Sequence, residues 1–279
     1  RIGGTNNQGV LFEWDPSTNI YSQKVNLDST NGYSPLSSLT SLNGKFYGMT
    51  EQGGDFGYGV IFEWDPVTNI YTKKINFNGT NGRGPIGGLI LHNGKFYGMT
   101  TGGGINLYGV IFEWDPVTNI YTKKVDFSNS SGGFPHGSLS LFSGKFYGTT
   151  YLGGVGGTGI LGGVIFEWDP VTNIYTKKID FIGTNGESSN STLTLVRNKF
   201  YGTTCRGGLY DNGVLFEWDP VTNIYTKKID FNDEGWCPTG KLKFLDGKFY
   251  GITMYNSENG FGSIFEWDPV TNIYTKKAN

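Results

Sequence analysis

The chain has 279 residues, a formal net charge of −2 at pH 7 and only 16% charged residues. This balance gives no electrostatic case for nucleic acid, because binding to polyanions depends on clustered cations. The 45 glycines and 16% aromatic residues favour strands joined by tight turns, and no apolar run approaches the roughly 20 residues that span a bilayer. We therefore expect an all-β protein without a nucleic-acid partner and without membrane insertion.

One sequence motif recurs along the whole chain. A tryptophan in the context "FEWDP" appears about every 50 residues, at Trp14, Trp64, Trp114, Trp168, Trp218 and Trp267. A second marker, "KFYG", recurs with a similar period, and one longer unit carries the glycine-rich stretch "LGGVGGTGILGG", which we interpret as a loop insertion. Self-similarity at this period is typical of repeat architectures.

Each unit predicts four short strands, named A to D in chain order. In the second complete unit, strand A is expected near 88–91 and is followed by "HNG", a tight hairpin turn. Strand B is "KFYGMT", and a loop with two glycines, the B–C loop, leads to strand C, "GVIFEW". The turn "DPVTN" precedes strand D, "YTKKVDF". The segment from strand D to the next strand A is the D–A loop.

Four-stranded meanders at this period predict the blades of a β-propeller. Blades stack on one another, which explains why both faces of strand C are apolar. Six C–D halves but five A–B halves are visible, and we favour six blades in a single domain with the first A and B strands upstream of residue 1. Five blades with a spare half-blade, or a β-solenoid, are the alternatives. The expected limits are 1–28 for the partial blade and then 29–78, 79–128, 129–182, 183–232 and 233–279.

The order "LNGKFYGMT", a glycine pair and "VIFEWDPVTNIYTKK" resembles the kelch repeat. It is more similar still to the GloVer-type tandem repeats of secreted bacterial proteins, in which "LYGTT...GG...G.VF" units recur in the same order. The resemblance covers essentially the whole chain and implies a propeller in a secreted or cell-surface protein. The chain departs from the kelch pattern where "MTEQ" or "MTTG" precedes the glycines, and its last unit has "YNSENG" instead. A fold hosts many functions, so the resemblance implies architecture and no particular activity.

The repeated charged residues favour a structural role. A catalytic residue is needed once per site, whereas the glutamate of "FEWDP" is present in every unit. We expect the aspartate of the same motif to serve the turn, and the tyrosine of "KFYG" to pack in the interior. The lysine pairs on strand D are expected on a solvated outer edge, where lysine opposes edge-to-edge association; a basic rim for anionic partners is the alternative.

The B–C and D–A loops differ between units, and a meander places them on the same face. Loops on a rigid scaffold concentrate binding residues, although neutral drift would also diversify them. Exposed aromatic and polar side chains favour a carbohydrate ligand, with a surface protein as the next partner. The predicted ligand-binding residues are Trp236, Phe134, His136, Tyr33, Arg83, Tyr151, Arg206, Tyr210 and Asp211.

Two other functions compete with a non-enzymatic binding or adhesion module. A secreted glycan-active enzyme would use the loop carboxylates Asp211, Asp233 and Glu234, and it requires a pair with a raised pKa in a concave pocket. A purely structural spacer domain would need no pocket. With two histidines and no nucleophile or phosphate-loop motif, we assign no catalytic residue, metal or cofactor.

Cys205 and Cys237 are the two cysteines of the chain. Both are expected in loops of the variable face, so a disulfide is sterically plausible. It would close a 32-residue span, contribute roughly 3 kcal/mol of stability and fit an oxidising, extracellular compartment. Two free thiols are the alternative.

Overall fold

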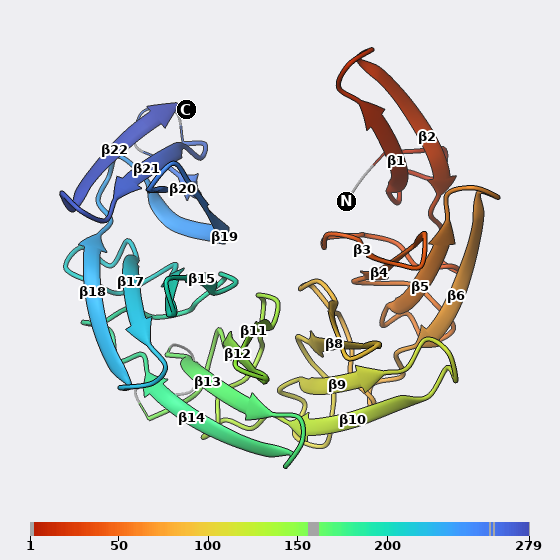
Figure 1. The fold of residues 1–279 in the computed structure, drawn as a ribbon, viewed down its shortest axis with the longest axis horizontal. Coiled ribbons are helices and arrows are strands. Elements are labelled where there is room, and N and C mark those ends of the chain that lie inside the picture. Colours follow the sequence, from red (N-terminus) through yellow and green to blue (C-terminus); the bar gives the residue numbers. More distant parts are fainter. Residues whose placement is uncertain (1–2, 156–161, 257, 259, 279) are drawn as a thin grey trace. The chain divides into compact units, whose positions relative to one another are not determined.

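The computed structural model describes residues 3–155, 162–256, 258 and 260–278. The centre of the expected glycine-rich insertion lies outside these residues. The regular elements of the described part are all β-strands (Figure 1). Within that part there is no helix long and apolar enough to cross a membrane.

The strands form six antiparallel sheets in chain order. The first sheet has two strands, β1 (Val10–Asp15) and β2 (Ile20–Asn26). The next two sheets contain β3 (Thr40–Leu42), β4 (Lys45–Thr50), β5 (Val60–Asp65) and β6 (Ile70–Asn76), followed by β7 (Ile90–His92), β8 (Lys95–Thr100), β9 (Val110–Trp114) and β10 (Tyr121–Asp126).

The last three sheets follow the same order. Their strands are β11 (Ser140–Phe142), β12 (Lys145–Thr149), β13 (Val164–Asp169) and β14 (Ile174–Asp180); β15 (Thr194–Val196), β16 (Lys199–Thr203), β17 (Val214–Asp219) and β18 (Ile224–Asp230); and β19 (Trp236–Leu245), β20 (Lys248–Tyr255), β21 (Ile264–Asp268) and β22 (Ile273–Ala278).

Each four-stranded sheet is a meander in which sequence neighbours pair. Such sheets, one after another along the chain, are the blades of a β-propeller, and the predicted fold class is confirmed. The two-stranded sheet carries the C and D strands of its repeat. Strand A of the second complete unit was predicted slightly too early, because it begins at Ile90. The carbonyl of Leu89 instead accepts a hydrogen bond of 2.7 Å from the Thr40 hydroxyl of the preceding sheet.

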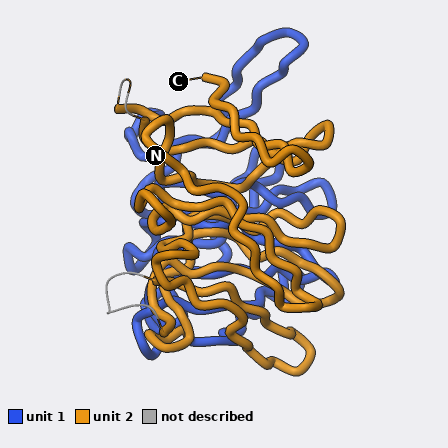
Figure 2. The backbone as a smooth tube through the Cα atoms, turned by 90° about the vertical axis from the view of Figure 1, so that its left-hand side faces the viewer, with its two compact units in different colours: residues 1–126 blue, residues 127–279 orange. Residues whose placement is uncertain are grey.

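The chain divides into two compact units, residues 1–126 and 127–279 (Figure 2). The core of each unit lies between neighbouring sheets. In unit 1, Tyr47 of β4 packs on Phe96 of β8, with ring centroids 4.7 Å apart, and both rings contact Trp114. Unit 2 repeats this arrangement between its own sheets. A single domain with the blade limits given above stays a prediction.

The conserved spacing of tryptophan and asparagine within the repeat has a structural cause. The indole nitrogen of Trp114 donates to Asn119 Oδ1 at 3.1 Å, and the turn places Asn119 at φ +58°, a conformation that asparagine tolerates well. The Asn119 amide in turn donates to the Lys74 carbonyl of the preceding sheet at 3.4 Å. The Trp–Asn bond recurs in all six sheets. Asn69 and Asn272 repeat the bond to a lysine carbonyl of the preceding sheet within their own units.

The repeated glutamate is also structural, as predicted. In the second complete unit Glu113 accepts hydrogen bonds from Lys95 at 2.8 Å and Tyr97 at 3.0 Å, and Lys124 lies 3.5 Å away. Burial by itself would raise the pKa of Glu113. The hydrogen bonds from Lys95 and Tyr97 and the charge of Lys124 outweigh burial, so the pKa lies below its ordinary value. Asp115 accepts backbone hydrogen bonds within its turn, which confirms the role expected for it.

The prediction of a solvated lysine edge is wrong in detail. Strand D is an edge strand, but most of its lysines are half-buried and form ion pairs, while Lys227 and Lys277 are exposed. Lys74 lies 3.4 Å from Glu63, and Lys73 pairs with Asp55 at 2.5 Å. The ladder shifts register between Ile61 and Phe62, and this bulge leaves Lys74 without a cross-strand partner, free to reach the glutamate.

Candidate functional site

The D–A and B–C loops lie on the same face of each sheet, because short backbone bridges join them. Arg83 donates its N–H to the Gly102 carbonyl at 2.8 Å, and Gly102 returns a bond of 3.0 Å. In each of the other four-stranded sheets, one residue of the D–A loop pairs in the same way with one residue of the B–C loop. In the last sheet this pair belongs to the β19–β20 ladder. We call the two residues the bridge pair. Its members are Tyr33/Gln52, Arg83/Gly102, Gly133/Leu152, Glu187/Arg206 and Trp236/Tyr255.

The residue that follows the first bridge residue has a left-handed backbone in each of the five four-stranded sheets. These residues are Ser34, Gly84, Phe134, Ser188 and Cys237, with φ between +52° and +60°. In unit 2, the N–H of Ser188 donates to Gly162 at 2.7 Å and that of Cys237 to Asn212 at 3.0 Å, in both cases a carbonyl of the preceding B–C loop. The backbone of the face is therefore fixed from sheet to sheet, while the bridge-pair side chains vary.

Three residues predicted from the sequence, Tyr33, Arg83 and Trp236, occupy the same structural position. Glu187 also occupies it and was not predicted. A signal was available, because Tyr33, Arg83 and Glu187 each directly follow an Asn-Gly dipeptide. Phe134 occupies the neighbouring left-handed position and is half-buried.

Trp236 was predicted in a loop, and this placement is wrong, since it begins strand β19. It pairs with Tyr255 at the end of β20, and the two rings stack with centroids 5.8 Å apart and an interplanar angle of 26°. Trp236 is half-buried and Tyr255 is 42% exposed. The pair therefore presents an aromatic surface held by a strand ladder.

Cys205 and Cys237 form the predicted disulfide, so the alternative of two free thiols is wrong. Cys237 lies in β19 and not in a loop, and Cys205 belongs to the B–C loop of the preceding sheet. The bond therefore joins two neighbouring sheets at the variable face. It also holds loop residues 205–213 against residues 232–237; we call these two segments the disulfide-linked loops.

The disulfide-linked loops form an open, shallow pocket of about 300 Å³, lined by Tyr210, Asn232, Asp233 and Glu234. The Tyr210 side chain is 58% exposed, and Asp233 accepts a hydrogen bond of 3.3 Å from the Asn212 amide. The pocket thus combines one aromatic ring with carboxylate and amide oxygens. Asp211 has a different task, because its Oδ1 accepts the Gly207 N–H at 2.9 Å inside the B–C loop.

Glu187 and Arg206 form the neighbouring bridge pair. Burial raises the pKa of Glu187, and the charge of Asp211 adds to this effect, while Arg206 opposes it. Arg206 is exposed. Arg206 and Asp211 belong to the disulfide-linked loop 205–213, so this loop brings a guanidinium and a carboxylate close to Glu187.

His136 and Tyr151 form a third cluster in unit 2. Their rings stack with centroids 4.6 Å apart, and His136 Nδ1 lies 2.6 Å from Asn190 Oδ1. Because an amide oxygen only accepts, this contact requires the proton on Nδ1. The structure thus brings His136 together with Tyr151. The described residues of the chain contain no group of three or more His, Cys, Asp or Glu side chains that could hold a metal ion.

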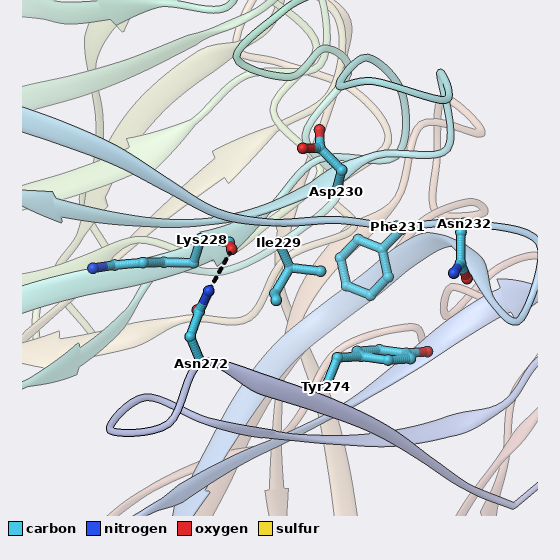
Figure 3. A pocket seen from close by; sticks show the side chains of 7 residues that line it. All are labelled: Lys228, Ile229, Asp230, Phe231, Asn232, Asn272 and Tyr274. Atoms are coloured by element: carbon cyan, nitrogen blue, oxygen red, sulfur yellow. Dashed lines mark hydrogen bonds between the residues drawn. The ribbon is translucent and has the colours of Figure 1, made fainter.

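Figure 3 shows a different pocket of about 250 Å³, between β18 and the turn before β22. Asn272 lines this pocket, and its side-chain amide donates a hydrogen bond of 3.4 Å to the Lys228 carbonyl. Lys228, Asp230, Asn272 and Tyr274 are repeat residues with equivalents in the other units. We therefore interpret this pocket as part of the seam between two sheets and not as a ligand site.

Comparison with known proteins identifies the repeat. The model of the Gloeobacter/Verrucomicrobia repeat matches residues 1–162 and 156–279, which is the whole chain. The chain belongs to this family. The GloVer-type resemblance is thereby confirmed, while the kelch likeness stays a prediction. None of the curated proteins compared with the chain matches it.

Solved structures share the fold. A chain of a nidogen–laminin complex is 11% identical with a TM-score of 0.58, and the alignment covers 95% of this repeat chain and 86% of that one. The extracellular domain assigned to a one-component system of B. thetaiotaomicron is 11% identical with a TM-score of 0.63, over 99% of this chain and 34% of that one. The tricorn protease is 15% identical with a TM-score of 0.52, and the alignment covers 96% of this chain and 24% of that one. At these identities the likeness concerns the fold.

Proposed function

We propose that this repeat protein is a non-enzymatic binding module of the extracellular space or cell surface, and that its variable loop face binds carbohydrate. The observation that carries the proposal is the stacked Trp236–Tyr255 pair. It stands at the bridge position, where the repeats differ, on a backbone that the repeats keep constant. A rigid scaffold with variable side chains is how binding residues are commonly displayed.

The chemistry around this pair suits a sugar. An aromatic face packs against the apolar face of a pyranose ring, and a few fixed polar groups then orient the ligand. Tyr210 supplies a second exposed ring, and Asn232, Asp233 and Glu234 supply oxygens in the adjoining pocket. The disulfide between Cys205 and Cys237 keeps the two sides together, and it favours an oxidising compartment.

Binding of the chain to a broad panel of immobilised glycans tests this function. We expect specific binding that Trp236→Ala weakens. The matched control is Tyr21→Ala, because Tyr21 stacks on Phe12 at 5.3 Å and both rings are exposed, but both occupy repeat positions away from the loops. If the folded protein bound no glycan of the panel, or if both variants lost the same glycan affinity, a carbohydrate site at Trp236 would be contradicted.

A protein partner is the second candidate, and the exposed tips of the loops favour it. In unit 2, Val155, Leu209 and Phe261 are 81%, 71% and 76% exposed, and exposed apolar surface of this kind marks interaction sites when it is contiguous. The nidogen–laminin structure is itself a protein complex. This function predicts capture on an array of purified extracellular proteins that Leu209→Ser/Phe261→Ser abolishes and Trp236→Ala leaves intact. Equal capture by the Ser variant would exclude these tips as the contact.

A further inference from the structure

The first strand of the last sheet carries two lysines that the other repeats lack. Lys241 and Lys243 lie in β19, and the equivalent positions of the other repeats hold Ser, Gly, Thr or Ile. At the position of Lys243, three sheets have a hydroxyl that donates to a leucine carbonyl of the next sheet, through Thr40, Ser140 and Thr194 at 2.6 to 2.8 Å. Lys243 thus replaces a structural hydroxyl by a charge.

Both lysines point to the same side of the strand. Lys241 and Lys243 are exposed, whereas Leu242 between them is buried. The β19–β20 register shifts between Thr239 and Lys243, so Lys241 lies in a bulge while Lys243 pairs with Tyr250. They line a groove of about 530 Å³ together with Phe244 and with the neighbouring edge strand β15, which contributes Thr194, Leu195 and Val196. β15 and β19 contact each other along this groove.

The groove is basic. Within the described residues neither Lys241 nor Lys243 has an ion-pair partner. The repeat glutamates of these two sheets are already bound, Glu217 by Lys199 at 2.7 Å and Glu266 by Lys248 at 2.7 Å. Arg197 follows β15 directly and adds another exposed cation, while Asp246 at the end of the β19–β20 hairpin is the acidic neighbour in sequence. The other edge strands of this kind, β3, β7, β11 and β15, carry no Lys, Arg, Asp or Glu.

We propose that this groove binds an acidic protein segment in an extended conformation. In an extended peptide, carboxylates at alternate positions lie on one side about 7 Å apart, so two of them can face the exposed Lys241 and Lys243. The opposite side chains would contact Leu195, which is 38% exposed, and Phe244. Binding of an extended peptide along an exposed sheet edge is a known recognition mode. This site is separate from the variable loop face and does not depend on its ligand.

Fluorescence anisotropy with labelled peptides tests the proposal. The probes are an octapeptide that alternates Glu and Ser, and a second octapeptide of the same composition with its four Glu consecutive. Oligogalacturonate of matched charge is the third probe. The variant is Lys241→Gln/Lys243→Gln. Its matched control is Lys177→Gln/Lys227→Gln, which removes the same charge from exposed or half-buried lysines of β14 and β18.

The expected result is that the alternating peptide binds best and that the groove variant weakens it about tenfold, since an exposed ion pair contributes up to about 1 kcal/mol. The control variant should keep nearly full affinity. Preference for oligogalacturonate would overturn the peptide proposal in favour of an acidic glycan. If both variants lost the same affinity for the alternating peptide, binding would be non-specific charge attraction and the groove would not be the site. The absence of binding by every peptide would also refute the site.

Discussion

Removing the charge of one repeat glutamate should destabilise the fold in proportion to its burial. Glu113 is the test position, because its side chain is 13% exposed and binds Lys95, Tyr97 and Lys124. Glu113→Gln keeps the shape but converts charge-assisted hydrogen bonds into neutral ones. A hydrogen bond to a charged group contributes about 1.5–3 kcal/mol, against about 1 kcal/mol for a neutral one.

The loss over the two hydrogen bonds is then about 2 kcal/mol. Lys95 is 40% exposed, so water screens part of its attraction, and we expect a total loss of about 1–2 kcal/mol. Glu13 occupies the same repeat position and serves as the control. It is 62% exposed and pairs with Lys24 at 2.8 Å, so Glu13→Gln should cost less than about 0.5 kcal/mol.

Urea unfolding at pH 7, followed by tryptophan fluorescence and circular dichroism, measures both variants under the same conditions. The expected outcome is a clearly lower midpoint for Glu113→Gln than for Glu13→Gln at an unchanged slope. Equal midpoints, or a more stable Glu113→Gln variant, would refute the view that the repeated glutamate stabilises each blade through its buried network.

Three further outcomes are expected. Cys205→Ser/Cys237→Ser should lose about 3 kcal/mol of stability, and reductant should lower the melting temperature of the parent but not of the variant. Burial and the hydrogen bond to the Glu63 carboxylate raise the pKa of Tyr47 to about 12, so the stability from this neutral tyrosine is complete below about pH 10 and is lost as the pH rises toward 12. Tyr47→Phe should therefore lose less stability than the parent between about pH 10 and 12, while the equivalent tyrosines keep the rest of the alkaline loss. Gly98→Ala places a Cβ 2.5 Å from Phe112 Cζ and should cost about 1–3 kcal/mol, and Phe112→Leu in the same chain should recover part of that loss.

The strands and their order were predictable because their determinants are local. The Trp and Asn of each turn lie five residues apart and bond to each other, and the glycine of "KFYG" is required where the Phe of strand C crosses it. The lysine partners were not predictable in this way. A bulge in the ladder, at Lys74 in the first complete unit, turns that lysine toward Glu63, and strict alternation along the strand does not reveal such a bulge.

The candidate site was predicted in outline and missed in detail. Loop variability is the basis for proposing this face as the site, which stays a prediction, whereas the disulfide expected from the loop positions is confirmed. Trp236 was assigned to the D–A loop because of its place in the repeat, between strand D of one unit and strand A of the next. The pairing of Trp236 with Tyr255 makes this segment an edge strand, where proline is tolerated. The pairing of the two bridge residues is long-range, and Glu187 was overlooked although it follows an Asn-Gly dipeptide as Tyr33 and Arg83 do.

The most direct test of the account exchanges one bridge pair for another. Trp236→Tyr/Tyr255→Gln installs the pair that the first complete unit carries as Tyr33 and Gln52, on a backbone that accepts both. The measurement is the binding profile of parent and variant over the same glycan panel, with urea midpoints to show that both are folded. The account predicts that the variant loses or changes the preferred ligands of the parent. An identical profile with identical affinities would contradict the claim that the bridge pair forms the binding site.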